Sequence, residues 1–307
     1  MTPDELEAAL TPPVAFVLSG GAGLGALHVG MLRGLATTGV EPALVVGTSV
    51  GALNGAVLAA AGSVADGAER LVGIWRSLRR HDVFPGGLTS QVLSLARNGH
   101  LFPDSGLRRL VARSLTTERI EDLPLPFVAV AAEALTGHVH LFESGPILDA
   151  LLASTAIPLV FPPAEVGGTL FEDGGTVTNV PMGPAVALGA GSLVVLDAGN
   201  VCHLSEPPGG LADRVLLAVH RALQQRAFIE APMLARRLPV LYLPRPCVED
   251  WSPLDLERGA GLVDTAEAEV LSFLEEKPAP AVGAMVGGPH THGGQAFVPT
   301  VLKALDR

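Results

Sequence analysis

The sequence predicts an α/β fold with a mostly parallel central sheet. Short runs of Val, Leu and Ala alternate with longer segments of helical periodicity along most of the chain. Strands that alternate with helices form parallel sheets, because each helix returns the chain to the start of the next strand. With 307 residues, 48% of them hydrophobic, the chain can build one large domain around such a sheet.

The predicted strands are short apolar runs bounded by glycine, proline or polar residues. In chain order they are Val14–Leu18, Ala43–Val46, Phe127–Ala132, Val139–Phe142, Gly167–Phe171, Ser192–Leu196 and Val240–Leu243. The third and fourth are predicted to form a hairpin, because only the turn Glu133–Gly137 and one further residue separate them.

The predicted helices have apolar residues at helical spacing or a capping residue at their start. They cover residues 26–35, the segment after Ser49, and Val64–Arg80, Asp104–Leu115, Pro146–Ser154, Leu211–Phe228 and Asp255–Leu274. The stripe in the third of these is interpreted as core; it consists of Leu71, Ile74, Trp75 and Leu78. His81–Gln91 contains Pro and Gly breakers and is predicted to be a loop. The domain is predicted to cover residues 1–277, followed by a flexible Gly/Pro-rich tail at 278–307.

Charge and composition argue against several classes of function. The formal net charge of −11 disfavours nucleic acid as a partner. Two cysteines give no disulfide framework, and Met1–Glu7 is acidic, unlike the start of a signal peptide. The apolar window Val45–Gly62 contains Thr48, Ser49 and Asn54 and lacks flanking aromatic or basic anchors, so it is not interpreted as a membrane span. The protein is predicted to be cytoplasmic, either free or bound peripherally at the membrane surface.

The most informative stretch is Gly47-Thr48-Ser49-Val50-Gly51, between a predicted strand and a helix. It matches Gly-x-Ser-x-Gly, the nucleophile elbow, in which a sharp turn exposes the serine hydroxyl. Small residues beside the serine permit that turn, and the helix N-terminus favours negative charge on its oxygen. Ser49 is therefore the candidate nucleophile.

A glycine-rich turn, Ser19-Gly20-Gly21-Ala22-Gly23-Leu24-Gly25-Ala26, follows the first predicted strand. Its N–H groups fit either an oxyanion hole or a dinucleotide-binding turn. The dinucleotide interpretation requires an acidic residue after the second strand to hold a ribose, and Gly47-Thr48-Ser49 stands there instead. No Gly-Lys-Ser/Thr is present, which excludes a P-loop. The turn is interpreted as an oxyanion hole. The alternative is a turn without a functional role, whose glycines only let the helix pack closely against the strand.

Four blocks in this order resemble the patatin-like phospholipase family in its bacterial form. They are Leu18–Leu32, Gly47–Asn54, Ala153–Pro163 and Asp173–Pro181, and together they cover roughly residues 14–200. The resemblance implies a patatin-like three-layer α/β/α fold with a Ser-Asp dyad. It further implies hydrolysis of carboxylic esters of acyl lipids, of the phospholipase A, lysophospholipase or esterase type, without cofactor or metal.

The resemblance also assigns roles to residues. Ser49 becomes the nucleophile that forms an acyl-enzyme, and Asp173 becomes its base. The backbone N–H groups of the turn become the oxyanion hole, which consists of Gly20, Gly21, Ala22 and Gly23. The supporting residues of the elbow and of the aspartate loop are Gly47, Gly51, Gly174 and Gly175.

The turn departs from the family's usual Gly-Gly-Gly-x-Arg/Lys-Gly at two positions. Ala22 replaces a glycine, and alanine resists positive φ, so the hole is expected to have a different shape. Leu24 replaces the basic residue, which favours neutral esters over phospholipids as substrates. The departures leave open a catalytically impaired lipid- or acyl-binding protein.

Histidines give one further alternative and two structural expectations. A conventional esterase would combine Ser49, Asp173 or Asp197, and His220. His28 is expected to be a packed or capping residue. His138 and His140 share one side of a strand and are interpreted as surface residues rather than metal ligands.

Apolar segments at Phe84–Leu101 and Leu159–Pro163 predict a lid or rim with transient contact to a membrane surface.

Overall fold

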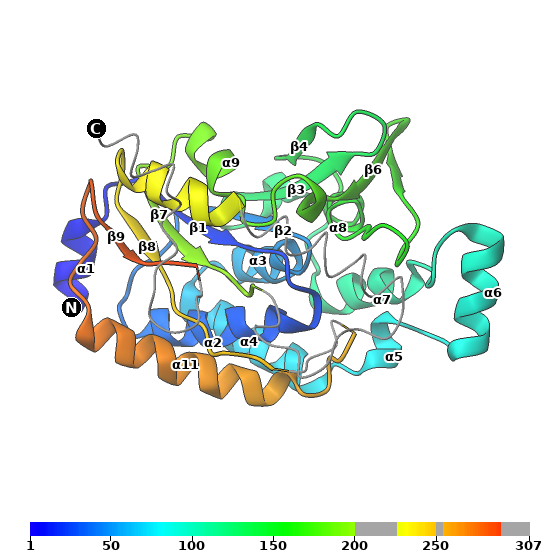
Figure 1. The fold of residues 1–307 in the computed structure, drawn as a ribbon, viewed down its shortest axis with the longest axis horizontal. Coiled ribbons are helices and arrows are strands. Elements are labelled where there is room, and N and C mark those ends of the chain that lie inside the picture. The colour runs from blue at the N-terminus through cyan, green and yellow to red at the C-terminus, as the bar shows by residue number, and fades with distance from the viewer. Residues whose placement is uncertain (200–225, 250–253, 290–307) are drawn as a thin grey trace.

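The computed structural model describes residues 1–199, 226–249 and 254–289, and Figure 1 shows their arrangement. Within these residues nine strands form one sheet in the order β5-β6-β3-β2-β1-β7-β8-β9, with β4 also paired to β3. Their bounds are β1 Val14–Leu18, β2 Leu44–Thr48, β3 Phe127–Glu133, β4 Val139–Phe142, β5 Ala164–Val166, β6 Thr169–Asp173, β7 Ser192–Leu196, β8 Val240–Tyr242 and β9 Met285–Gly287. The pairs from β3 through β9 in this order are parallel, whereas β4, β5 and β6 pair antiparallel.

Helices cover both faces of the sheet (Figure 1). On one face α2, α3, α4 and α11 pack together, and on the other α9 contacts β1, β2 and β7. The bounds are α1 Pro3–Ala9, α2 Ala26–Ala36, α3 Val50–Ala61, α4 Val64–Ser77, α5 Arg80–Val83, α6 Leu88–Asn98, α7 Ser105–Ser114, α8 Ile147–Ser154, α9 Met182–Ala187 and α11 Gly259–Glu276. Residues 226–235 are also helical. The result is the three-layer α/β/α architecture.

The alternation of side chains along β1 divides the core between the two faces. Phe16 and Leu18 point into the larger hydrophobic cluster, under α2, α3, α4 and α11. Ala15 and Val17 point into the smaller cluster, beside α9 and the helix at 226–235. All four are fully buried, as expected for a central strand covered on both faces.

Most of the predicted elements are confirmed. Every predicted strand is present, and its ends differ from the predicted bounds by at most two residues. The strands Phe127–Glu133 and Val139–Phe142 form the predicted antiparallel hairpin. The prediction of a helix over Leu211–Phe228 lies largely outside the described residues. Among the described helices, none combines the length and the apolar character needed to cross a bilayer.

Two predictions need correction. His81–Gln91 is not a continuous loop, because α5 continues to Val83 before the break at Pro85-Gly86-Gly87 and α6 begins at Leu88 after it. The sheet also continues past residue 277, the predicted end of the domain. There β9 pairs in parallel with β8 and places Val286 opposite Leu241, with Val286 only 7% exposed. A short apolar segment among glycines and prolines was sufficient for this edge strand.

Candidate active site

Ser49 stands at the carboxyl end of β2, immediately before α3, as the elbow motif predicts. Its backbone has φ 55° and ψ −124°, a conformation that costs a residue other than glycine on the order of 1–3 kcal/mol. A Cβ on Gly47 would overlap the backbone of Gly51, and a Cβ on Gly51 would overlap the carbonyl groups of Leu18 and Ser19. Both glycines of the motif are therefore required by close backbone contacts.

Ser154, at the end of α8, holds this strained turn. Its Oγ accepts a hydrogen bond from the Ser49 amide at 2.9 Å and donates one to the Val130 carbonyl at 2.7 Å. Ser154 is fully buried, so neither bond competes with bulk water. Ser154 belongs to one of the four blocks, but sequence reasoning gave it no role, because the bond depends on how α8 and β3 pack beside the elbow.

Asp173 ends β6, which pairs antiparallel with β3 and places Asp173 opposite Ala131. The Gly175 amide donates to Oδ1 of Asp173 at 2.7 Å. Gly174 lies directly against the Val130 carbonyl, where a Cβ would overlap the oxygen. The two glycines after Asp173 thus fix the loop that presents the carboxyl group.

Asp173 and Ser49 lie close together although 123 other residues separate them in sequence. Burial raises the pKa of Asp173 to about 7, while the Ser49 hydroxyl and the Gly175 amide oppose part of that rise. The Ser49 hydroxyl is close enough to act on the pKa of Asp173, yet Oδ2 of Asp173 is buried without a hydrogen-bond partner among the described residues. Loose geometry of this kind is common in unliganded sites and tightens when substrate binds.

The glycine turn after β1 lies beside the elbow. A Cβ built on Gly20 would be 3.4 Å from the Ser49 Cβ. The Gly20 amide donates to the Asn179 carbonyl at 2.9 Å, so it is not free to serve as an oxyanion donor. The amides of Gly21, Ala22 and Gly23 have no acceptor among the described residues. The turn therefore offers three N–H groups where the sequence predicted four.

Both departures from the family turn have a structural outcome. Ala22 adopts φ 47°, so alanine takes the left-handed conformation that the turn requires despite its Cβ. Leu24 is only 3% exposed and belongs to the larger hydrophobic cluster. An apolar side chain therefore packs where the family pattern has a cation.

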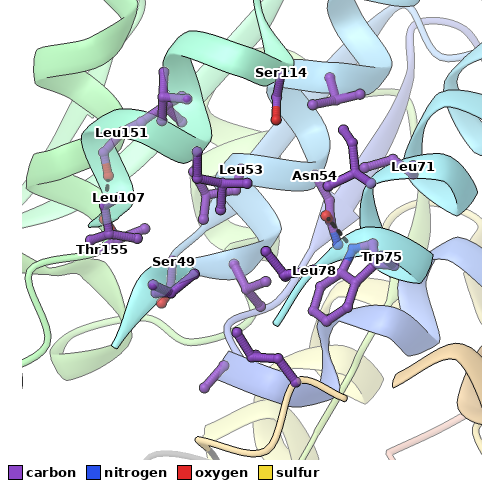
Figure 2. Close-up of a pocket in the computed structure, with 18 of the residues that line it drawn as sticks. Ser49, Leu53, Asn54, Leu71, Trp75, Leu78, Leu107, Ser114, Leu151 and Thr155 are labelled. Atoms are coloured by element: carbon purple, nitrogen blue, oxygen red, sulfur yellow. Dashed lines mark hydrogen bonds between the residues drawn. The ribbon is translucent and has the colours of Figure 1, made fainter. Parts of the chain in front are cut away.

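An apolar pocket opens at Ser49 (Figure 2). Its empty space, counted together with the open solvent at its mouth, is about 750 Å³. Ser49, Leu53 and Val57 line it along one side of α3. The helical rise over the eight steps from Ser49 to Val57 is about 12 Å, so the pocket follows the helix for that length. Leu71, Ile74, Trp75 and Leu78 line it as well. The prediction that this stripe is core is confirmed, since Leu71, Trp75 and Leu78 belong to the larger hydrophobic cluster, and the same stripe also forms a wall of the pocket.

Three phenylalanines form a cluster beside the pocket. The rings of Phe84, Phe102 and Phe161 have centroids 5.2 to 6.4 Å apart, and Phe84 and Phe161 line the pocket. Backbone bonds from Leu101 to Leu159 and from Phe102 to Val160 join the two segments that the sequence predicted as a rim.

Beneath the pocket, His28 belongs to a buried network and is not a base for Ser49. Trp75 Nε1 donates to Asn54 Oδ1, so Asn54 Nδ2 faces the Gly25 carbonyl at 2.9 Å and His28 Nδ1 at 3.3 Å. His28 Nδ1 is then an acceptor, and the ring proton is on Nε2. Burial lowers the pKa of His28 to about 4, so the ring is neutral at pH 7. The expectation of a packed histidine is confirmed.

The other candidates that the structure describes have surroundings of their own. Asp197 is bonded to the Tyr242 hydroxyl and the Gly199 amide. His220, the base of the alternative triad, lies outside the described residues. His140 contacts the rings of Phe142 and Phe171, and His138 is exposed. Across the described residues, no three His, Cys, Asp or Glu side chains are grouped so that they could hold a metal ion.

The chain belongs to the patatin-like phospholipase family, a family of lipid hydrolases, whose model matches residues 16–186. This range runs from β1 into α9 and includes Ser49, Ser154 and Asp173. The family and the three-layer fold implied by the sequence are thereby confirmed.

Relatives cover only part of the chain. An uncharacterized NTE family protein of Mycobacterium bovis is 34% identical over 181 residues, which are 59% of this chain and 47% of that protein. The lysophospholipase NTE1 of Mycosarcoma maydis is 30% identical over 191 residues, which are 61% of this chain and 10% of that protein. The chain thus spans about half the length of the first and a tenth of the second. The solved structure of VipD from Legionella pneumophila superposes with a TM-score of 0.45 and 16% identity, over 87% of this chain and 67% of VipD.

Proposed function

We propose that this protein is a serine acyl hydrolase that cleaves carboxylic esters of acyl lipids. The observation that carries the proposal is the position of Ser49, strained at the elbow, open to an apolar pocket and next to a buried carboxyl group with a pKa of about 7. The pocket fits an acyl chain, the serine supplies a nucleophile, and the carboxylate supplies a base.

In the proposed first half-reaction, Asp173 accepts the proton of the Ser49 hydroxyl while Oγ attacks the ester carbonyl carbon. A carboxylate of ordinary pKa is a weak base, and burial brings Asp173 close to the optimum for proton transfer at neutral pH. The tetrahedral intermediate collapses, Asp173 returns the proton to the departing alcohol oxygen, and the acyl-enzyme remains on Ser49.

The developing oxyanion needs donors close to the Ser49 hydroxyl. The amides of Gly21, Ala22 and Gly23 are the candidates, because they have no internal acceptor among the described residues and Ala22 also lines the pocket. The N-terminus of α3 adds a favourable dipole at the same place.

In the second half-reaction, Asp173 accepts a proton from water, whose oxygen attacks the acyl carbonyl. The ester bond to Ser49 breaks, the proton passes to Ser49 Oγ, and the free acid leaves. The same two side chains serve both half-reactions, so the proposed chemistry requires neither cofactor nor metal.

Neutral esters fit this site better than phospholipids do. Leu24 occupies the family's cationic position and is buried in the core, so it offers no charge to a phosphate. Lysophospholipids and phospholipids are the alternative substrates, and a comparison of acylglycerols with phospholipids of the same acyl chain distinguishes the two classes.

We further infer that the edge carrying α6 contacts lipid surfaces from a peripheral position. In Figure 1 α6 projects from the body of the protein, beyond α5 and α7. Leu93 and Leu95 on α6 are 48% and 41% exposed, and Leu159 near the pocket is 50% exposed. Co-sedimentation with phosphatidylcholine vesicles is expected to weaken when Leu93 and Leu95 are both replaced by Glu. It should not weaken for Leu135→Glu, which changes an 88% exposed leucine in the turn between β3 and β4.

Hydrolysis of p-nitrophenyl esters and labelling by a fluorophosphonate probe test the catalytic proposal. Ser49→Ala is expected to abolish both, and Asp173→Asn to abolish turnover. Activity that survives in Asp173→Asn and is lost in His220→Ala would favour the triad instead. Failure of the wild-type protein to react with the probe, together with measurable binding of a fatty acid, would favour an acyl-binding protein.

A further inference from the structure

One polar group in the pocket wall is not used by the protein itself. Ser114, the last residue of α7, lines the pocket, and its Oγ is buried without a hydrogen-bond partner among the described residues. Figure 2 shows the Ser114 hydroxyl directed toward the group of lining side chains that includes Leu53 and Asn54. Its hydroxyl has open capacity for both donating and accepting.

The other polar side chains that line the pocket are already bonded within the protein. Thr155 Oγ1 donates to the Leu151 carbonyl at 2.7 Å. Trp75 Nε1 donates to Asn54, whose amide nitrogen faces the Gly25 carbonyl and His28. Apart from the proposed nucleophile, Ser114 is thus the one lining side chain, among the described residues, with an unused polar group.

Ser114 lies away from the reacting carbonyl. Figure 2 shows Ser114 well apart from Ser49, with the side chain of Leu53 drawn between the two. A polar atom that meets Ser114 therefore belongs to the acyl chain at a position remote from the ester. It does not belong to the ester group or to the alcohol part of the substrate.

A buried hydroxyl without a partner is costly, and a ligand that bonds it removes this cost. A saturated chain leaves the cost in place, since methylene groups neither donate nor accept. We propose that the pocket selects acyl chains that carry a hydroxyl group at some distance from the carboxyl carbon, with Ser114 as the specificity-determining residue. The proposal deepens the proposed function and depends on the same pocket.

The test compares p-nitrophenyl esters of one saturated medium-chain acid with esters of its monohydroxylated positional isomers. Wild-type protein is expected to show kcat/KM about 2- to 10-fold higher for one isomer than for the saturated ester, the range that a single neutral hydrogen bond provides. Ser114→Ala is expected to remove this preference, so that the hydroxylated and saturated esters have about the same kcat/KM. Ser114→Thr, which keeps the hydroxyl, is expected to retain it.

Thr155→Val is the matched control, because it removes a pocket hydroxyl that is already bonded; the ratio between isomers should stay as in the wild type. Equal ratios in wild type and Ser114→Ala for every isomer would overturn the proposal. The same holds if Ser114→Ala changes all esters by one common factor, which would mean that Ser114 holds only a water molecule.

A binding measurement separates this proposal from the catalytic one. In Ser49→Ala protein, hydroxylated and saturated free acids compete with a fluorescent fatty acid. If wild-type protein does not hydrolyse esters but the Ser114-dependent preference persists in binding, the proposed hydrolysis fails and the inference stands. If esters are hydrolysed and the preference is absent in both measurements, only the inference fails.

Discussion

The Ser49 amide donates to the Ser154 hydroxyl at 2.9 Å, although the two residues are 105 positions apart in sequence. The Ser154 hydroxyl in turn donates a hydrogen bond to the Val130 carbonyl in β3, and β3 pairs with β6, the strand that ends at Asp173. The strained elbow and the carboxyl group are therefore fixed to the same strand. This arrangement leads to the first expected outcome.

Ser154→Ala should reduce kcat about tenfold or more and leave KM within about twofold. The variant leaves the Ser49 amide buried without an acceptor, which costs on the order of 1–3 kcal/mol. Because that bond helps to hold the strained backbone of Ser49, its loss should displace the proposed nucleophile. Steady-state kinetics and thermal unfolding measure the two effects. Ser144→Ala, at an exposed serine, is the control. A purely structural Ser154 would lower thermal stability without changing kcat of the folded protein.

Asp173→Asn should abolish turnover and stabilise the fold above pH 7. The folded pKa of about 7 exceeds the ordinary value of 3.8, so the folded state binds the proton more tightly than the unfolded state. Stability from this group is complete at low pH and declines as pH rises toward 7. An asparagine removes the charge, so the gain above pH 7 is at most about 4 kcal/mol. Urea unfolding of both proteins at pH 5 and pH 8 measures it. A variant less stable than wild type at pH 8 would contradict the expectation.

The pH dependence of kcat/KM should rise with pH through about 7 and then level off. The base is active only when Asp173 is deprotonated, and its burial moves that transition from the acidic range into the neutral range. His28 does not contribute, since its pKa of about 4 keeps it neutral throughout this range. Activity that stays constant from pH 5 to pH 8 would show that another group is the base.

Ala22→Gly should stabilise the protein by up to about 1 kcal/mol and should not reduce kcat. Ala22 has φ 47°, where a Cβ is strained and glycine is not, and this gain is partly offset by the greater freedom of glycine in the unfolded chain. Ala112→Gly, at an exposed position within α7, is the matched control and should cost about 1 kcal/mol. Equal destabilisation by both substitutions would mean that the turn tolerates the alanine without strain.

The sequence predicted the parts of this site that depend on local structure. Gly47 and Gly51 mark the elbow because they stand with Ser49 in one five-residue motif, and the apolar run at Val14–Leu18 marks a central strand. Ser154 and the use of the Gly20 amide could not be predicted, since both depend on partners brought close only by tertiary packing.

The wall of the pocket and the edge strand β9 also could not be predicted from local sequence patterns. Periodicity identifies an apolar helix face but does not distinguish a face packed against another helix from one that lines a cavity. Trp75 belongs to the larger hydrophobic cluster, as predicted, and its position in the pocket wall could not be read from the periodicity. Met285–Gly287 is too short to give a strand signal of its own and is stabilised by its pairing with β8.

The Val130 carbonyl accepts from Ser154 and lies against Gly174, so one main-chain oxygen contacts the supports of both Ser49 and Asp173, the proposed catalytic pair. Every residue type carries this main-chain oxygen, so a change of side chain at position 130 that keeps the backbone in place also keeps the oxygen. The evolutionary constraint therefore falls on the two neighbours. Ser154 must keep a hydroxyl and Gly174 must stay without a side chain, while Val130 itself is free to vary with the packing of the smaller hydrophobic cluster.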